Sequence, residues 1–75
     1  MTPEKLREIR ERRSMSRREL GKLLGYGHPQ MAIWRIETGL SAGSPQTALL
    51  MRILDMPGGA GMLYEARNDE RKEEQ

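Results

Sequence analysis

The sequence contains no cysteine and only one histidine, His28. Without cysteine it can form no disulfide bond, and one histidine without cysteine partners cannot complete a zinc site. The N-terminus carries no long apolar run, and no segment approaches the length needed to cross a bilayer. We therefore expect no metal site, no thiol chemistry, neither a signal peptide nor a membrane anchor, and a cytoplasmic protein.

Residue arrangements typical of enzymes are also missing. A lone histidine cannot supply a catalytic triad, and we expect His28 to be a cap or turn residue. The glycine-rich segment of residues 58–61 (Gly-Gly-Ala-Gly) lacks both the Lys-Ser/Thr ending of a phosphate-binding loop and a preceding strand. We therefore expect a protein that is not an enzyme and that needs no cofactor.

The 75 residues, without internal duplication, are enough for one domain with a modest core. The net charge is +2, but it is unevenly distributed. Residues 1–64 hold 10 basic and 6 acidic residues, whereas residues 65–75 hold 3 basic and 5 acidic residues. On charge alone, nucleic-acid binding and an ordinary surface charge are equally good interpretations.

The first part of the chain predicts two helices. Thr2 can cap the first helix, which carries Leu6 and Ile9 on one face. The second begins at the capping box of residues 16–19 (Ser-Arg-Arg-Glu) and ends at Gly25. Its buried residues are predicted to be Leu20, Leu23 and Leu24.

Gly21 lies inside the second helix, where glycine costs roughly 1 kcal/mol relative to alanine. Its presence predicts that another helix approaches the backbone at this point. After a short turn, Pro29 opens a third helix that runs to about Thr38 and stops at Gly39.

Ser44 and Pro45 repeat the combination of a cap and a proline, and they predict the start of a fourth helix. Its apolar face consists of Leu49, Leu50, Ile53 and Leu54. Residues 60–67 can form a short fifth helix, whereas residues 68–75 are almost entirely charged or amide side chains, which we expect to be disordered. The predicted domain is therefore residues 1–67.

Two short helices joined by a turn with a glycine at the bend are typical of the helix-turn-helix. Over residues 3–54 the sequence resembles the Cro and phage-repressor type of DNA-binding protein, the XRE family. The resemblance is carried by residues 6–10 (LREIR), 15–25 (MSRRELGKLLG) and 36–39 (IETG). It implies an all-α fold, namely a compact lambda-repressor-like DNA-binding domain of four to five helices.

The turn departs from the family, because it is about two residues longer, and this leaves two alignments of the third helix. If the end of the helix sets the alignment, Ile33 and Ile36 belong to the core. The residues that face DNA are then Gln30, Met31, Trp34 and Arg35. If the start sets it, Met31 and Trp34 belong to the core. We prefer the first alignment, because Pro29 belongs near the start of the helix and residues 37–39 anchor its end.

The resemblance implies that the third helix lies in the major groove of double-stranded DNA. Glutamine can pair with adenine and arginine with guanine, which makes Gln30 and Arg35 candidates for base readout; plain surface polarity is the alternative. Trp34 can contact a thymine methyl group, although a tryptophan in a small domain is more often a core residue.

The family also contacts phosphates at the start of the second helix, so at least one of Arg17 and Arg18 should neutralise the DNA backbone. Secondary candidates for phosphate contact are Thr38, Ser41, Ser44 and Gln46.

A domain this small buries little surface on DNA, and family members pair two recognition helices about 34 Å apart on a near-palindromic site. We therefore expect a homodimer. Its interface residues are predicted to be Met56, Met62, Leu63 and Tyr64, which could equally fold back over the core of the monomer.

The expected function is that of a DNA-binding transcriptional regulator, a repressor or autoregulator. Two alternatives remain. An antitoxin-like regulator would use residues 56–75 to bind a partner protein, and a protein-interaction module would keep the helices without binding DNA.

Overall fold

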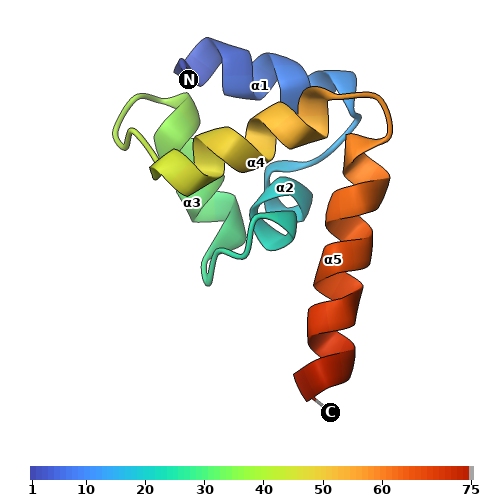
Figure 1. Ribbon diagram of the computed structural model, residues 1–75. Helices are drawn as coiled ribbons and strands as arrows, with labels where there is room; N and C mark the ends of the chain where they lie inside the picture. The colour runs from blue at the N-terminus through green and yellow to red at the C-terminus, as the bar shows by residue number, and fades with distance from the viewer. Residues whose placement is uncertain (75) are drawn as a thin grey trace.

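The structure is a computed structural model that describes the backbone of residues 1–74 and the side chains of residues 1–68. Five helices, joined by short turns and loops, are present among these residues. They are α1 (Pro3–Arg12), α2 (Arg17–Leu23), α3 (Pro29–Glu37), α4 (Pro45–Asp55) and α5 (Gly59–Glu74). Figure 1 shows α1 across one end of the molecule, with α5 extending past the other helices. No strand is present among these residues, and the predicted all-α class is confirmed.

Local capping explains where three of the helices begin. The hydroxyl groups of Thr2, Ser16 and Ser44 each accept a hydrogen bond from the backbone amide three residues further along, at 3.0–3.1 Å. The carboxylate of Glu19 accepts one in return from the amide of Ser16, at 3.2 Å. These bonds satisfy amides that the first turn of a helix leaves without partners, and the predicted starts are confirmed.

The core lies between α1, α2, α3 and α4 and consists of nine buried apolar side chains. Among the core residues predicted for the first three helices, only Leu24 falls outside the buried set, since it is half-buried at the end of α2. The nine are Leu6, Ile9, Met15, Leu20, Leu23, Ile33, Ile36, Met51 and Leu54.

The predicted apolar face of α4 is partly wrong. Met51 and Leu54 are fully buried, whereas Leu49 is 56% exposed and both Leu50 and Ile53 are half-buried. Apolar residues occupy most positions in the middle of this helix, so periodicity alone does not show which of them is central. Packing against the other helices selects Met51.

The predicted close approach at Gly21 is confirmed. Gly21 is buried, and a Cβ atom at this position would collide with the backbone of Pro29 at the start of α3. In agreement with this, α2 packs against α3 more extensively than any other two helices pack in the described chain. The absence of a side chain therefore sets how closely the two helices pack.

Helix α5 is longer than expected. It begins at Gly59 and continues to Glu74, through most of the segment for which the composition predicted disorder. No glycine or proline follows Gly61, and the alanine, glutamate, arginine and lysine residues beyond it are good helix formers, so nothing in the sequence ends the helix. Its first turns pack against α4 and α2.

Candidate nucleic-acid interface

The alignment of α3 is decided by which of its side chains are buried. Ile33 is fully buried and Ile36 is 5% exposed, whereas Met31 is 54% and Trp34 is 41% exposed. The alternative that placed Met31 and Trp34 in the core is therefore wrong. Gln30 and Arg35 are exposed as well, so all four predicted base-reading residues lie on the outward side of α3.

The turn between α2 and α3 contains a glycine that caps α2. The residues between the end of α2 and the start of α3 include Gly25, whose φ of +87° ends α2 in the left-handed conformation that favours glycine. The amide of Tyr26 donates to the carbonyl of Gly21 at 3.0 Å, which closes the C-terminal cap. His28 occupies the N-cap position of α3, where its side chain makes no capping bond within the described chain.

Met31 lines two hollows in the surface. One is lined by Arg18, His28, Pro29, Gln30 and Met31, and it joins the start of α2 to the start of α3. The other is lined by Tyr26, Gly27, His28, Met31, Ala32 and Arg35. Among these lining residues there is no aspartate or glutamate. The first half of α3 is thus bordered by cationic and neutral side chains.

The two arginines that open α2 have different surroundings. Arg18 is exposed and lines the hollow at the start of α3. Arg17 is half-buried, and its Nε donates to Oε1 of Glu37 at 3.2 Å. Of the two predicted phosphate contacts, Arg18 is the more accessible, whereas the half-buried Arg17 is paired with Glu37.

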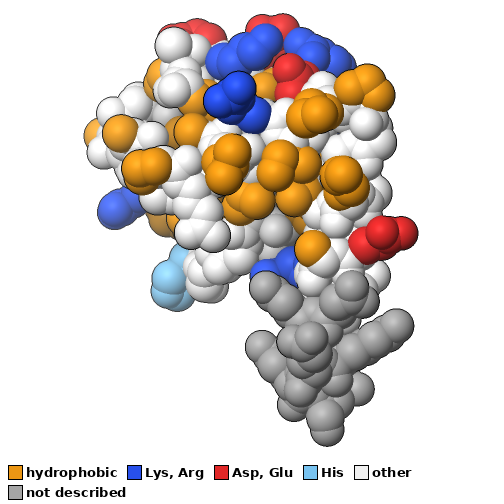
Figure 2. Space-filling view, in the orientation of Figure 1, with side chains coloured by type: hydrophobic (Ala, Val, Ile, Leu, Met, Phe, Trp, Pro, Cys, Tyr) orange, Lys and Arg blue, Asp and Glu red, His pale blue; other side chains and the backbone are white. Residues whose placement is uncertain are grey.

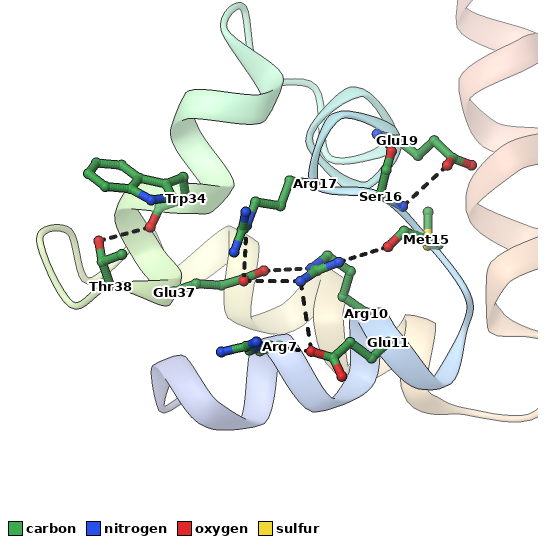
Figure 3. Close-up of polar contacts among 10 residues, drawn as sticks. All are labelled: Arg7, Arg10, Glu11, Met15, Ser16, Arg17, Glu19, Trp34, Glu37 and Thr38. Carbon is green, nitrogen blue, oxygen red and sulfur yellow. Dashed lines mark hydrogen bonds and ion pairs between the residues drawn. The ribbon is translucent and has the colours of Figure 1, made fainter.

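Glu37 is the centre of a buried ion-pair cluster that the sequence analysis missed. Its side chain is only 3% exposed. Arg10 of α1 donates to both of its oxygens, from Nε at 2.6 Å and from Nη2 at 3.2 Å, and Arg17 of α2 is the second partner (Figure 3). Arg10 also donates to the carbonyl of Met15 at 2.9 Å. The cluster joins α1, α2 and the end of α3.

A signal for this cluster exists in the sequence. Glu37 lies four positions after Ile33 and one after Ile36, which places it on the buried side of a helix. A carboxylate on that side needs a cationic partner, because burying an unpaired charge is very costly. The sequence does not show which of the many arginines is the partner, since that depends on the packing of three helices.

The secondary phosphate candidates are all exposed, but all three of their hydroxyl groups already make local bonds. At the C-cap of α3, the hydroxyl of Thr38 donates to the carbonyl of Trp34 at 2.9 Å (Figure 3) and to that of Arg35 at 3.2 Å. Ser44 caps α4, and Ser41 accepts a bond from the amide of Gly43 at 3.2 Å. Gln46 lies in the first turn of α4.

A hydroxyl network also ties the turn to α4. Tyr26 is half-buried against the core, and its hydroxyl group is hydrogen-bonded to Oγ1 of Thr47. Thr47 is 7% exposed and shares a further bond with the hydroxyl of Ser44, at 3.1 Å. This contact could not be predicted from the sequence, because Tyr26 lies in a turn where periodicity carries no information. The network holds the turn before α3 next to the start of α4.

The outer face of α1 is covered by ion pairs between neighbouring turns. Arg7 donates to Glu11 at 2.8 Å, and this hydrogen bond lowers the pKa of the Glu11 carboxyl while the carboxylate raises the pKa of Arg7. Arg12 contacts Glu8 at 2.6 Å in the same way. The positive charge of α1 is therefore largely balanced on its own surface.

The four predicted interface residues do not behave alike. Leu63 is half-buried and packs against the core, as one of the two alternatives expected. Met56, Met62 and Tyr64 are 58%, 62% and 45% exposed. Figure 2 shows apolar side chains gathered on the face formed by α4 and the start of α5. Three large apolar side chains in this region are thus exposed, whereas Leu63 between them is half-buried against the core.

Comparison with known proteins found no matching family model, no matching curated protein and no matching solved structure. The resemblance to the XRE family therefore stays a prediction from the residues that carry it. In the described part of the chain, no helix is long and apolar enough to cross a membrane, and no group of three or more His, Asp or Glu side chains is placed to hold a metal ion.

Proposed function

We propose that the protein is a sequence-specific DNA-binding transcriptional regulator, not an enzyme, in which α2, the turn and α3 form a helix-turn-helix. The observation that carries the proposal is the outward side of α3, where Gln30, Met31, Trp34 and Arg35 are all exposed. These side chains do not contribute to the core, and the hollows around them contain Arg18 and Arg35 but no lining carboxylate.

Such a surface suits the major groove for two reasons. Its cationic side chains attract the phosphates, which supply most of the sequence-independent affinity. Its central side chains can reach base edges, where Arg35 can pair with guanine and Gln30 with adenine. The ion pairs of Glu37 and the backbone contact at Gly21 hold α3 in place, so the groove-facing side chains are presented on a rigid support.

We further propose that the protein binds a near-palindromic operator as a homodimer and represses transcription by occupying a promoter. Support comes from Met56, Met62 and Tyr64, three large apolar side chains after α4 that stay exposed in the single chain. A second copy would cover part of this apolar area. Two copies would present two α3 helices about 34 Å apart, which is one turn of the DNA helix.

Footprinting on the DNA upstream of the protein's own coding region tests the proposal. The unaltered protein should protect a near-palindromic site. Arg35→Ala should bind about 10- to 100-fold more weakly, as expected for the loss of one bidentate base contact. Arg52→Ala removes the same charge from the exposed side of α4 and serves as the control, with a footprint like that of the unaltered protein. Equal binding by Arg35→Ala would reject the role given to α3.

The same exposed residues on α5 favour a second candidate, an antitoxin-like regulator. It would use α3 on DNA and the segment 56–75 on a partner protein instead of a second copy. Co-purification of a different chain in a fixed ratio, lost in Met62→Asp, would favour this candidate, whereas a protein that purifies as a homodimer would favour the first.

A further inference from the structure

The centre of the outward side of α3 is apolar. Met31 and Trp34 lie one helical turn apart, 54% and 41% exposed, between the polar side chains of Gln30 and Arg35. The ring of Trp34 points away from the other helices (Figure 3). Met31 lines both of the hollows described above. A large apolar side chain gains most when a partner covers it with an apolar group.

The surroundings of this apolar centre restrict the partner. Arg18 lines one of the two hollows and Arg35 lines the other, and neither hollow is lined by a carboxylate among the described residues. A polyanion therefore fits the border of the surface, whereas an apolar group fits its centre. On the base edges of the major groove, the only apolar group is the 5-methyl group of thymine.

We propose that Met31 and Trp34 recognise thymine methyl groups, so that the operator carries T·A pairs opposite the middle of α3. This inference rests on the proposed function, because it requires α3 to lie in the major groove. Met31 is nearer to the start of the helix, and this is the end that reaches base edges in a helix-turn-helix. It is therefore the main contact, and Trp34 covers a second methyl group one turn further along.

Deoxyuridine substitution in the footprinted operator tests the inference, since it removes the methyl group and leaves base pairing unchanged. Each contacted thymine should cost about fourfold in Kd when it is replaced, which corresponds to burial of one methyl group. Met31→Ala should bind the thymine operator more weakly and should no longer distinguish thymine from deoxyuridine at one position. Leu49→Ala removes an exposed apolar side chain from α4 and should keep the full preference.

The outcomes separate this inference from the proposed function. Unaltered protein that fails to bind any upstream fragment even at low salt overturns both. Protein that protects its site but binds thymine and deoxyuridine operators equally at every position overturns only the thymine contacts. The thymine contacts are also overturned if Met31→Ala releases a bound partner protein and leaves DNA binding unchanged. Thermal melts confirm that each variant is folded before binding is measured.

Discussion

Arg10 and Glu37 lie 27 positions apart in the chain and meet through two hydrogen bonds, from Nε at 2.6 Å and from Nη2 at 3.2 Å. Arg10 belongs to the last turn of α1 and Glu37 to the last turn of α3. The pair therefore connects the helix that begins the domain with the helix that we propose to enter the major groove.

Removal of the buried carboxylate should destabilise the fold strongly. Glu37→Gln leaves Arg10 and Arg17 without their anion, and the loss of one partner from a buried pair costs about 3–5 kcal/mol in the free energy of unfolding. Urea unfolding followed by circular dichroism measures this. Glu8→Gln, which breaks the exposed pair with Arg12, is the control and should cost about 0.5 kcal/mol or less. Equal losses in both variants would contradict a structural role for the buried pair.

The two glycines Gly21 and Gly61 should respond in opposite ways to alanine. Both lie inside helices, where alanine is intrinsically better by about 1 kcal/mol. At Gly21 the new Cβ meets the backbone of Pro29, so Gly21→Ala should destabilise by about 1–3 kcal/mol. At Gly61 nothing lies within 4 Å, so Gly61→Ala should raise the melting temperature. A Gly21→Ala protein as stable as the unaltered one would show that the helices can separate without cost.

The hydroxyl of Tyr26 should contribute to stability. Tyr26→Phe removes the bond to Thr47 and leaves a buried hydroxyl with one partner fewer, at a cost of about 1 kcal/mol. The chain provides a matched control in its other tyrosine, since Tyr64 is 45% exposed and Tyr64→Phe should change the free energy of unfolding by less than about 0.5 kcal/mol. Similar denaturation midpoints for the two variants would argue against the network.

The Glu11 carboxyl should titrate below its ordinary range, because Arg7 hydrogen-bonds it and lowers its pKa. Since the folded pKa is the lower one, the contribution of the pair is present above the unfolded pKa and disappears as the pH falls through the folded pKa. In an NMR titration, Arg7→Gln should move the Glu11 midpoint upward, and added salt should do the same, because the pair is exposed. An unchanged midpoint in Arg7→Gln would refute the assignment.

Trp34 should report DNA binding directly, because it is the only tryptophan. In the free protein its ring is 41% exposed, so acrylamide should quench its fluorescence readily. Operator DNA should protect it, and the protection should weaken steeply as salt is raised. If quenching is the same with and without bound operator, the ring is not covered by DNA.

Several features of the fold follow from the sequence, because their causes are local. A capping residue acts on an amide three positions away, and for this reason the starts of α1, α2 and α4 could be predicted from Thr2, Ser16 and Ser44. The glycine inside α2 likewise predicted a close helix contact. The same local reasoning failed at the end of α5, where composition suggested disorder although each residue tolerates a helix.

What the sequence alone determined is the number and order of the first helices and the identity of most of the core. Only the tertiary structure decided which side of α3 faces outward, which residue of α4 is central, and which arginines pair with Glu37. Two alignments of α3 satisfied the same helical period, and they differ only in which side chains the other helices cover. Choosing between them requires contacts between residues far apart in the chain, which no local pattern contains.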